Sequence, residues 1–194
     1  MASNVLVIIP ARVGSKGIPG KNFRPITEHG DNPVDLAVTC ALNLRYTPQI
    51  VISTDAAIPP VGIFNGVQVI HRPKNMALDT TLMSTVVGHV LGEIPGPPHQ
   101  IVVLLQPTQP LRKVKYVDRA IHWIESGQAD AVVSLTLAES RLFVVESISQ
   151  KVMSFTSPIS DRRQDAPVLY KRDGTVYAVL RKNGWKKGQS YGVM

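Results

Sequence analysis

The residues best suited to chemistry lie in one segment near the start of the chain, Ile8–Asn22, with the sequence IIPARVGSKGIPGKN. Glycines permit positive φ angles that turn backbone N–H groups toward a ligand, and basic side chains add fixed positive charge. The glycines are Gly14, Gly17 and Gly20, and the basic residues are Arg12, Lys16 and Lys21. Because an apolar run ends at Ile9, the loop should follow a buried strand at the ligand-binding edge of a sheet. The segment therefore predicts a grip for a di- or triphosphate, although a solvated glycine-rich turn would have a similar composition.

The spacing within this loop excludes two familiar phosphate motifs. A P-loop needs glycine five residues before a Gly-Lys pair and Ser or Thr after it, whereas Ser15 and Asn22 occupy those positions here. The dinucleotide fingerprint GxGxxG also fails, because Ser15 and Lys16 flank the pattern and do not complete it. A different class of nucleotide site is therefore expected.

Two later segments also combine polar side chains with a stiff backbone. Leu104–Arg112, with the sequence LLQPTQPLR, follows another apolar run and offers the Gln106 amide and the Arg112 guanidinium. Arg162–Tyr177, with the sequence RRQDAPVLYKRDGTVY, is rich in arginine and tyrosine near the start of a predicted strand. Taken alone, the first is equally consistent with a rigid surface turn, and the second is more typical of a solvated charged loop.

Short apolar runs alternate with helical patterns along the chain, which favours an α/β fold with a mostly parallel central sheet and helices on both faces. The expected strands are Asn4–Ile9, Gln49–Ser53, Val67–His71, Ile101–Gln106 and Ala131–Leu137. Apolar residues at helical spacing predict helices at Pro33–Arg45, Leu82–Leu91 and Val114–Ile124. Asn32 is expected to cap the first helix, and Gly127 to end the last.

The pattern changes after the fifth predicted strand. Residues 138–167 are expected to leave the main sheet and to contain a hairpin of Leu142–Ser147 and Lys151–Phe155. Strand character resumes at Thr175–Leu180 and again at Ser190–Met194. With 194 residues and 44% hydrophobic composition, the chain is expected to form one domain, 1–194, into which this excursion is inserted.

The formal net charge of +7 points to a polyanionic partner, which could be a triphosphate, nucleic acid or an anionic membrane. No aromatic-interleaved basic stripe or nucleic-acid motif accompanies the charge. The apolar run Val5–Ile9 is too short for a secretory signal or a membrane span, and the single cysteine, Cys40, fits a buried thiol in a reducing compartment. We therefore expect a cytoplasmic protein that binds neither nucleic acid nor membranes.

The three polar segments, in this order, resemble the CMP-N-acylneuraminate (CMP-sialic acid) synthetases, the cytidylyltransferases that activate nine-carbon sugar acids. The family pattern I-P-A-R-x-G-S-K-G-I-P-x-K-N is matched at Ile9–Asn22, and L-Q-P-T-S-P-L-R is matched at Leu105–Arg112 with one change. Arg163–Tyr177 partly matches a third element, and VISTD at Val51–Asp55 and HRPKNMALD at His71–Asp79 also look like family elements. CMP-Kdo synthetases resemble the chain less, because their loop usually carries S-x-R-x-P-x-K.

This resemblance implies a Rossmann-like nucleotidyltransferase fold, CTP as donor, Mg²⁺ as cofactor, and a homodimer built through residues 138–167. The implied reaction is attack by the anomeric hydroxyl of a nine-carbon sugar acid on the α-phosphate of CTP, which releases pyrophosphate. Arg12 and Lys21 would be the catalytic residues that hold the phosphates. The implied nucleotide-binding residues are Ala11, Arg12, Gly14, Ser15, Lys21, Asn22, Arg72 and Thr81, and the implied sugar-acid-binding residues are Gln106, Arg163, Asp173 and Tyr177.

The sequence also departs from the family pattern. The family carries an aspartate pair, in the context S-x-D-I-D, shortly after the strand that Ser190–Met194 resembles, and the present sequence stops before it. Carboxylate oxygens suit Mg²⁺, so no protein ligand of the metal is identified. Asp173 stands where the family has asparagine, and its charge would oppose an anionic substrate. The alternative expectation is therefore a catalytically impaired homologue that still binds nucleotide.

Overall fold

The computed structural model of the chain describes residues 4–56, 65–94, 96–97, 100–138, 143–145, 152–154, 168–181 and 192–193. The chain divides into two compact units. The first comprises Met1–Ser134 and Gly174–Met194, and the second comprises Leu135–Asp173. The predicted excursion, residues 138–167, falls within the second unit, and its part in a dimer stays a prediction.

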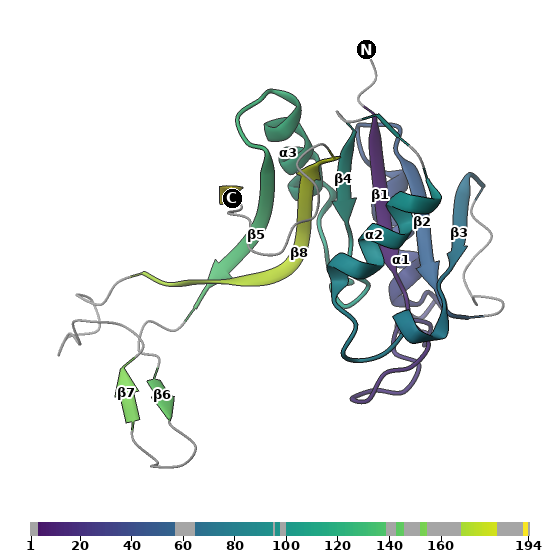
Figure 1. Cartoon of the computed structure of the whole chain (residues 1–194), viewed down its shortest axis with the longest axis horizontal. Helices are drawn as coiled ribbons and strands as arrows, with labels where there is room; N and C mark the ends of the chain where they lie inside the picture. Colours follow the sequence, from purple (N-terminus) through teal and green to yellow (C-terminus); the bar gives the residue numbers. More distant parts are fainter. Residues whose placement is uncertain are drawn as a thin grey trace. The chain divides into compact units, whose positions relative to one another are not determined.

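The main sheet has the strand order β3-β2-β1-β4-β8-β5-β9. β1 pairs in parallel with β2 and β4, β2 pairs in parallel with β3, and β8 runs antiparallel to β4. Figure 1 shows β1 between β4 and β2, with β3 beyond β2. The strands are β1 (Val5–Pro10), β2 (Gln49–Thr54), β3 (Val67–His71), β4 (Ile101–Leu104), β5 (Ala131–Leu137), β8 (Tyr170–Leu180) and β9 (Gly192–Val193). The mostly parallel sheet predicted from the sequence is confirmed.

Helices cover both faces of this sheet. Because successive residues of β1 point to opposite faces, the strand supplies apolar side chains to both layers. Val5, Val7 and Ile9 join a buried cluster with the apolar faces of α1 (Pro33–Leu42) and α3 (Val114–Glu125). Leu6 and Ile8 join a second cluster with α2 (Met83–Glu93), which lies in front of β1 in Figure 1. A strand buried on both faces reads as a continuous apolar run, and β1 is buried along its whole length.

The start of α1 follows the sequence prediction closely. The Asn32 side chain accepts hydrogen bonds from the backbone N–H groups of Val34 and Asp35, at 2.9 and 3.1 Å, and Pro33 occupies the first turn. The Asp35 carboxylate accepts from Asn32 N at 3.0 Å and so completes a capping box. The helix ends at Leu42 and not at the predicted Arg45, because Asn43 caps it and donates to Thr39 O at 2.8 Å.

The other predicted elements differ mainly at their ends. α3 is followed by Gly127 at φ 73°, as expected of a helix stop. β8 begins at Tyr170, ahead of the predicted Thr175, and a backbone bond from Ala138 N to Leu169 O at 2.9 Å shows that pairing with β5 continues there. The predicted hairpin in the second unit is confirmed by the antiparallel strands β6 (Phe143–Val145) and β7 (Val152–Ser154).

Within the part of the chain that the structure describes, no helix combines the length and the hydropathy needed to cross a bilayer.

Candidate functional site

A cavity of about 170 Å³ opens where the parallel strands β1, β3 and β4 end. Since carboxyl ends of parallel strands meet at one edge, the segments that follow these strands converge there. Among the described residues, its lining carries three cationic side chains and no carboxylate. The lining residues are Pro10, Arg12, Lys21, Asn22, Arg72, Met83, Gln106, Pro107 and Thr108. We call this the charged cavity.

Hydrogen bonds tie the loop that follows β1 to the end of β2 and to the start of α1. Val13 N donates to the Asp55 carboxylate at 2.8 Å, which fixes the loop against the end of β2. The buried Asn22 donates from its side-chain amide to Arg12 O at 2.9 Å, and its own carbonyl accepts from Val34 N at 3.3 Å. These bonds hold the two ends of the loop together beside the first turn of α1.

The glycines of the loop do not all act as the sequence predicted. Gly20 has a φ of 65°, and the turns around it are closed by Phe23 N donating to Gly20 O at 2.9 Å. Gly14 and Gly17 do not take positive φ, so that part of the prediction is wrong. Apart from the glycine itself and its two chain neighbours, no atom lies within 4 Å of the position that a Cβ would take at any of the three, which leaves the backbone open to a ligand.

Two basic side chains of the loop, Arg12 and Lys16, pair with the same carboxylate. The carboxylate of Asp79 forms an ion pair with the Arg12 guanidinium and lies 3.2 Å from Lys16 Nζ. Arg12 also donates to Ala77 O at 3.5 Å. Hydrogen bonds from Arg12 and Lys16 hold the pKa of Asp79 below its ordinary value, so the carboxylate is ionised at neutral pH. The segment that follows β3 and contains the short helix η1 (Lys74–Met76) therefore supplies the counter-charge of the loop.

Arg72 places a desolvated cation at the floor of the charged cavity. Only 7% of its surface is exposed, and burial lowers the pKa of its guanidinium. Arg72 Nη2 donates to Ser53 O at 3.0 Å, whereas Arg72 Nε and the nearby Ser53 hydroxyl are buried without a hydrogen-bond partner. A buried donor without an acceptor is costly, and a ligand that offers an oxygen or a ring nitrogen would satisfy it.

Arg112 holds the opposite wall of the charged cavity in place. Its Nε donates to Thr175 O at 2.6 Å, and its Nη2 donates to Gln106 O at 2.7 Å, so it ties the loop after β4 to β8. Gly174, at φ 79°, allows the strand to pass close to this loop, since a Cβ there would lie 3.2 Å from Gln106 Oε1. Arg112 thus positions Gln106 and is not part of the cavity lining.

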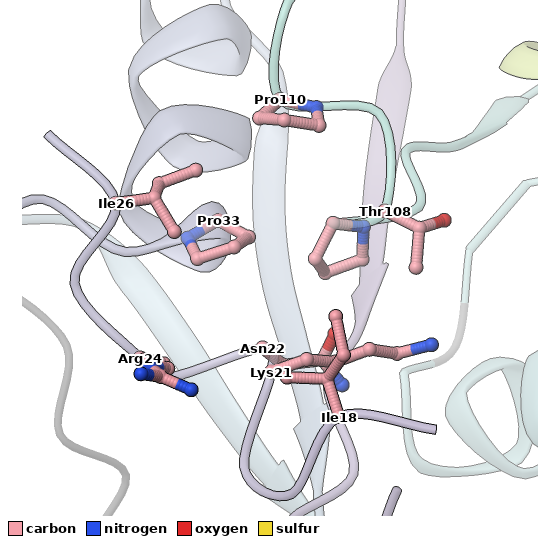
Figure 2. A pocket seen from close by; sticks show the side chains of 9 residues that line it. Ile18, Lys21, Asn22, Arg24, Ile26, Pro33, Thr108 and Pro110 are labelled. Atoms are coloured by element: carbon pink, nitrogen blue, oxygen red, sulfur yellow. The ribbon is translucent and has the colours of Figure 1, made fainter. Parts of the chain in front are cut away.

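A second, larger cavity of about 480 Å³ shares Lys21, Asn22, Pro107 and Thr108 with the charged cavity. Its remaining lining is mostly apolar and consists of Ile18, Arg24, Ile26, Pro33 and Pro110. Figure 2 shows Ile26 and Pro33 facing Pro110 and Thr108 across it, with Lys21 extending toward Thr108. Lys21 is therefore the cation that both cavities share.

The described residues do not provide a metal-binding cage. Over that part of the chain, no three His, Cys, Asp or Glu side chains are grouped so as to hold an ion. The two carboxylates beside the loop have other partners, because Asp55 accepts from Val13 N and Asp79 pairs with Arg12 and Lys16. A Mg²⁺ ion, which prefers several oxygen ligands, does not fit this donor set on protein ligands alone.

The structure brings together five of the residues singled out in the sequence, and the lining of the charged cavity contains Arg12, Lys21, Asn22, Arg72 and Gln106. Ala11 is buried beneath the loop, while Gly14 and Ser15 belong to the loop but not to the lining. Thr81 also lies outside the lining and donates to Asn75 O at 3.4 Å, whereas Met83 lines the cavity.

The other predicted residues are not joined to the charged cavity in the same way. Tyr177 is not among its lining residues and packs against the core cluster of α2. Asp173 belongs to the second unit, and Arg163 lies outside the described residues. Asp79 was not singled out as a site residue. The signal for it was the segment HRPKNMALD, whose last residue it is, but its ion pair with Arg12 spans a sequence separation that no local pattern reveals.

Comparisons with known proteins agree with this geometry. The model of a family described as cytidylyltransferase matches residues 6–187. The chain is 29% identical over 195 residues to an N-acylneuraminate cytidylyltransferase of Streptococcus agalactiae serotype III, covering 96% of this chain and 45% of that protein. It is also 29% identical over 184 residues to a CMP-N,N'-diacetyllegionaminic acid synthase of Legionella pneumophila, covering 92% of this chain and 78% of that protein.

Among solved structures, the chain resembles a CMP:2-keto-3-deoxy-manno-octonic acid synthetase complexed with CTP, with a TM-score of 0.67 and 18% identity. That match covers 92% of this chain and 75% of the other, and it supports the Rossmann-like nucleotidyltransferase fold expected from the sequence. The chain spans a little under half the length of the streptococcal relative. The sequence relatives confirm the resemblance inferred from the motifs.

Proposed function

The chain belongs to the cytidylyltransferase family, and we propose that it transfers the cytidylyl group of CTP to a nine-carbon sugar acid of the N-acylneuraminate type. The observation that carries this proposal is the charged cavity at the ends of β1, β3 and β4, where Arg12, Lys21 and Arg72 converge and none of the described lining residues is a carboxylate. Such a cavity complements a triphosphate, because three positive charges meet an anion that carries several negative ones.

In the proposed reaction, the anomeric hydroxyl oxygen of the sugar acid bonds to the α-phosphorus of CTP. The bond from that phosphorus to the α,β-bridging oxygen breaks, pyrophosphate departs with that oxygen, and the hydroxyl proton passes to solvent. Phosphoryl transfer needs little covalent chemistry from the protein, so positioning and charge neutralisation dominate. Arg12 and Lys21 would meet the charge that builds on the departing pyrophosphate, aided by the backbone around Gly14 and Ser15.

The cytosine nucleoside has a candidate place on the floor of the charged cavity. Arg72 Nε is a buried donor without a partner, and a carbonyl oxygen or ring nitrogen of a base would accept from it. Asn22 lines the same cavity, so we assign Arg72 and Asn22 to the base and ribose. The backbone near Ala11 and Thr81 would complete the nucleotide contacts.

The proposed acceptor of the cytidylyl group, a sugar acid, is inferred from the sequence relatives. Both sequence relatives reported above are named for activating sugar acids, which supports a substrate that carries a carboxylate. Gln106, which lines the charged cavity, would contact it together with Arg163, Asp173 and Tyr177. A homodimer through residues 138–167 and a cytoplasmic location, where CTP is available, complete the proposal.

Mg²⁺ would enter this site with the triphosphate, since a divalent ion neutralises the phosphate charge that the lining does not reach. The described residues give it no cage of protein oxygens, and no step above depends on it. The lack of a cage of protein oxygens among the described residues favours one alternative, a homologue that binds nucleotide without turnover.

A pyrophosphate-release assay with CTP, Mg²⁺ and a panel of nine-carbon sugar acids separates the two. The proposal predicts release that requires one of the acids, and Arg12→Ala should lower the rate by ~10² or more. Arg119→Ala is the matched control, because that exposed cation stacks on Trp123 of α3 and should leave the rate unchanged. CTP binding without release with any acid would favour the alternative, and absence of CTP binding would remove both.

A further inference from the structure

Asp79 forms an ion pair with the loop that follows β1, and this ion pair involves cations that a phosphate would also contact. Arg12 and Lys16 project from the loop after β1, and both direct their charge at one carboxylate, that of Asp79. Asp79 itself does not line the charged cavity, whereas Arg12 does. The Asp79 carboxylate thus accepts from N–H donors of Arg12 and Lys16 that the oxygens of an anionic ligand could also use.

The side chains of this ion pair are in contact with solvent. The exposed fractions are 27% for Arg12, 32% for Asp79 and 86% for Lys16. Ion pairs in contact with water contribute little to stability, because the separated charges regain hydration. The ion pair is therefore a poor candidate for a stabilising element of the fold, and its cations remain available for exchange.

A polyphosphate and the Asp79 carboxylate require the same donors. Arg12 and Lys16 satisfy Asp79 when no ligand is present, and a phosphate that contacts them must displace a carboxylate or lie beside it as a like charge. Either way, Asp79 opposes the bound polyphosphate. Pyrophosphate, which has no nucleoside to hold it on Arg72, is the more weakly held of the two ligands against this opposition.

We propose that Asp79 is an internal counter-anion that competes with polyphosphate for Arg12 and Lys16 and thereby promotes the departure of pyrophosphate. Before the nucleotide binds, it keeps the two cations in place; after transfer, it reclaims them. Asp79 is thus a positioning residue and does not take part in bond making. The inference rests on the proposed function for the identity of the ligand, but its test measures binding alone.

The test compares the dissociation constants of inorganic pyrophosphate and CTP by calorimetry in the wild type and in Asp79→Asn. Removing the competing charge should tighten the binding of both pyrophosphate and CTP about three- to tenfold. A purely structural role for Asp79 predicts the opposite sign, since loosening the loop would weaken both ligands. Asp79→Glu, which keeps the charge, should restore wild-type affinity.

Asp118→Asn is the matched control, because Asp118 also pairs with an arginine, Arg45, but lies on α3 outside the charged cavity. It should change neither dissociation constant. Unchanged or weaker pyrophosphate binding in Asp79→Asn, beside a wild type that binds CTP, would overturn the inference alone. A wild type that binds neither ligand would remove the proposed function together with it.

Discussion

Replacing Lys21 by alanine should weaken CTP binding about ten- to a hundredfold. Lys21 is half-buried and lines both cavities, and no carboxylate that would neutralise it is found among the described residues of either lining. Two unit charges 4 Å apart attract with about 4 kcal/mol at an effective dielectric constant of 20. Because the ammonium gives up part of its hydration, a net loss of about 1.5–3 kcal/mol is expected for a charge-assisted hydrogen bond. At 1.4 kcal/mol per tenfold change, this gives the predicted range.

Isothermal titration calorimetry with CTP measures this effect directly. Arg24→Ala is the matched control, because it also removes one positive charge from the segment between β1 and α1, but Arg24 lines only the larger, apolar cavity. The dissociation constant of CTP for this variant should change by less than about threefold, as expected when an exposed charge is removed. Equal losses in the two variants would mean that the triphosphate lies in the larger cavity, and an unchanged constant in Lys21→Ala would refute the assignment of Lys21.

Three further predictions concern the scaffold that positions the site. Asn32→Ala removes the cap of α1 and should lower the free energy of unfolding by about 1–2 kcal/mol in urea titrations, whereas Asn32→Asp should retain most of it. Gly174→Ala should cost about 1–2 kcal/mol in the same measurement, because φ is 79° and the new Cβ would lie 3.2 Å from Gln106 Oε1; wild-type stability would contradict this geometry. Cys40 is 6% exposed and burial raises its pKa, so a disulfide reagent such as DTNB should react slowly with native protein and give one equivalent after unfolding; fast reaction of native protein would place the thiol at the surface.

The elements that the sequence predicted well are those whose signals are local. The cap of α1 needs only Asn32, Pro33 and Asp35, which are neighbours in the chain, and β1 is recognisable because five consecutive apolar residues precede Pro10. The positive φ of Gly127 is similarly implied by its place after a helical repeat. In each case, the interacting groups lie within a few residues of one another, so composition and spacing suffice.

The features that were missed depend on distant contacts. Asp79 pairs with Arg12 although α1, β2 and β3 lie between them in the sequence. Arg112 joins Gln106, which follows β4, to Thr175 in the neighbouring strand β8. The early start of β8 at Tyr170 is another case, because a polar segment becomes a strand only when its backbone groups pair with β5. Gly14 and Gly17 show the converse, since glycine permits positive φ without requiring it.

The most direct test of the account is the identity of the nucleotide product. The protein would be incubated with Mg²⁺, nine-carbon sugar acids and an equimolar mixture of CTP, UTP, ATP and GTP, and the products would be measured by mass spectrometry. The expected product is a CMP ester of a sugar acid, with one pyrophosphate formed for each ester and little product from the other nucleotides. Esters formed equally from all four nucleotides, or CTP consumed without a CMP ester, would contradict it.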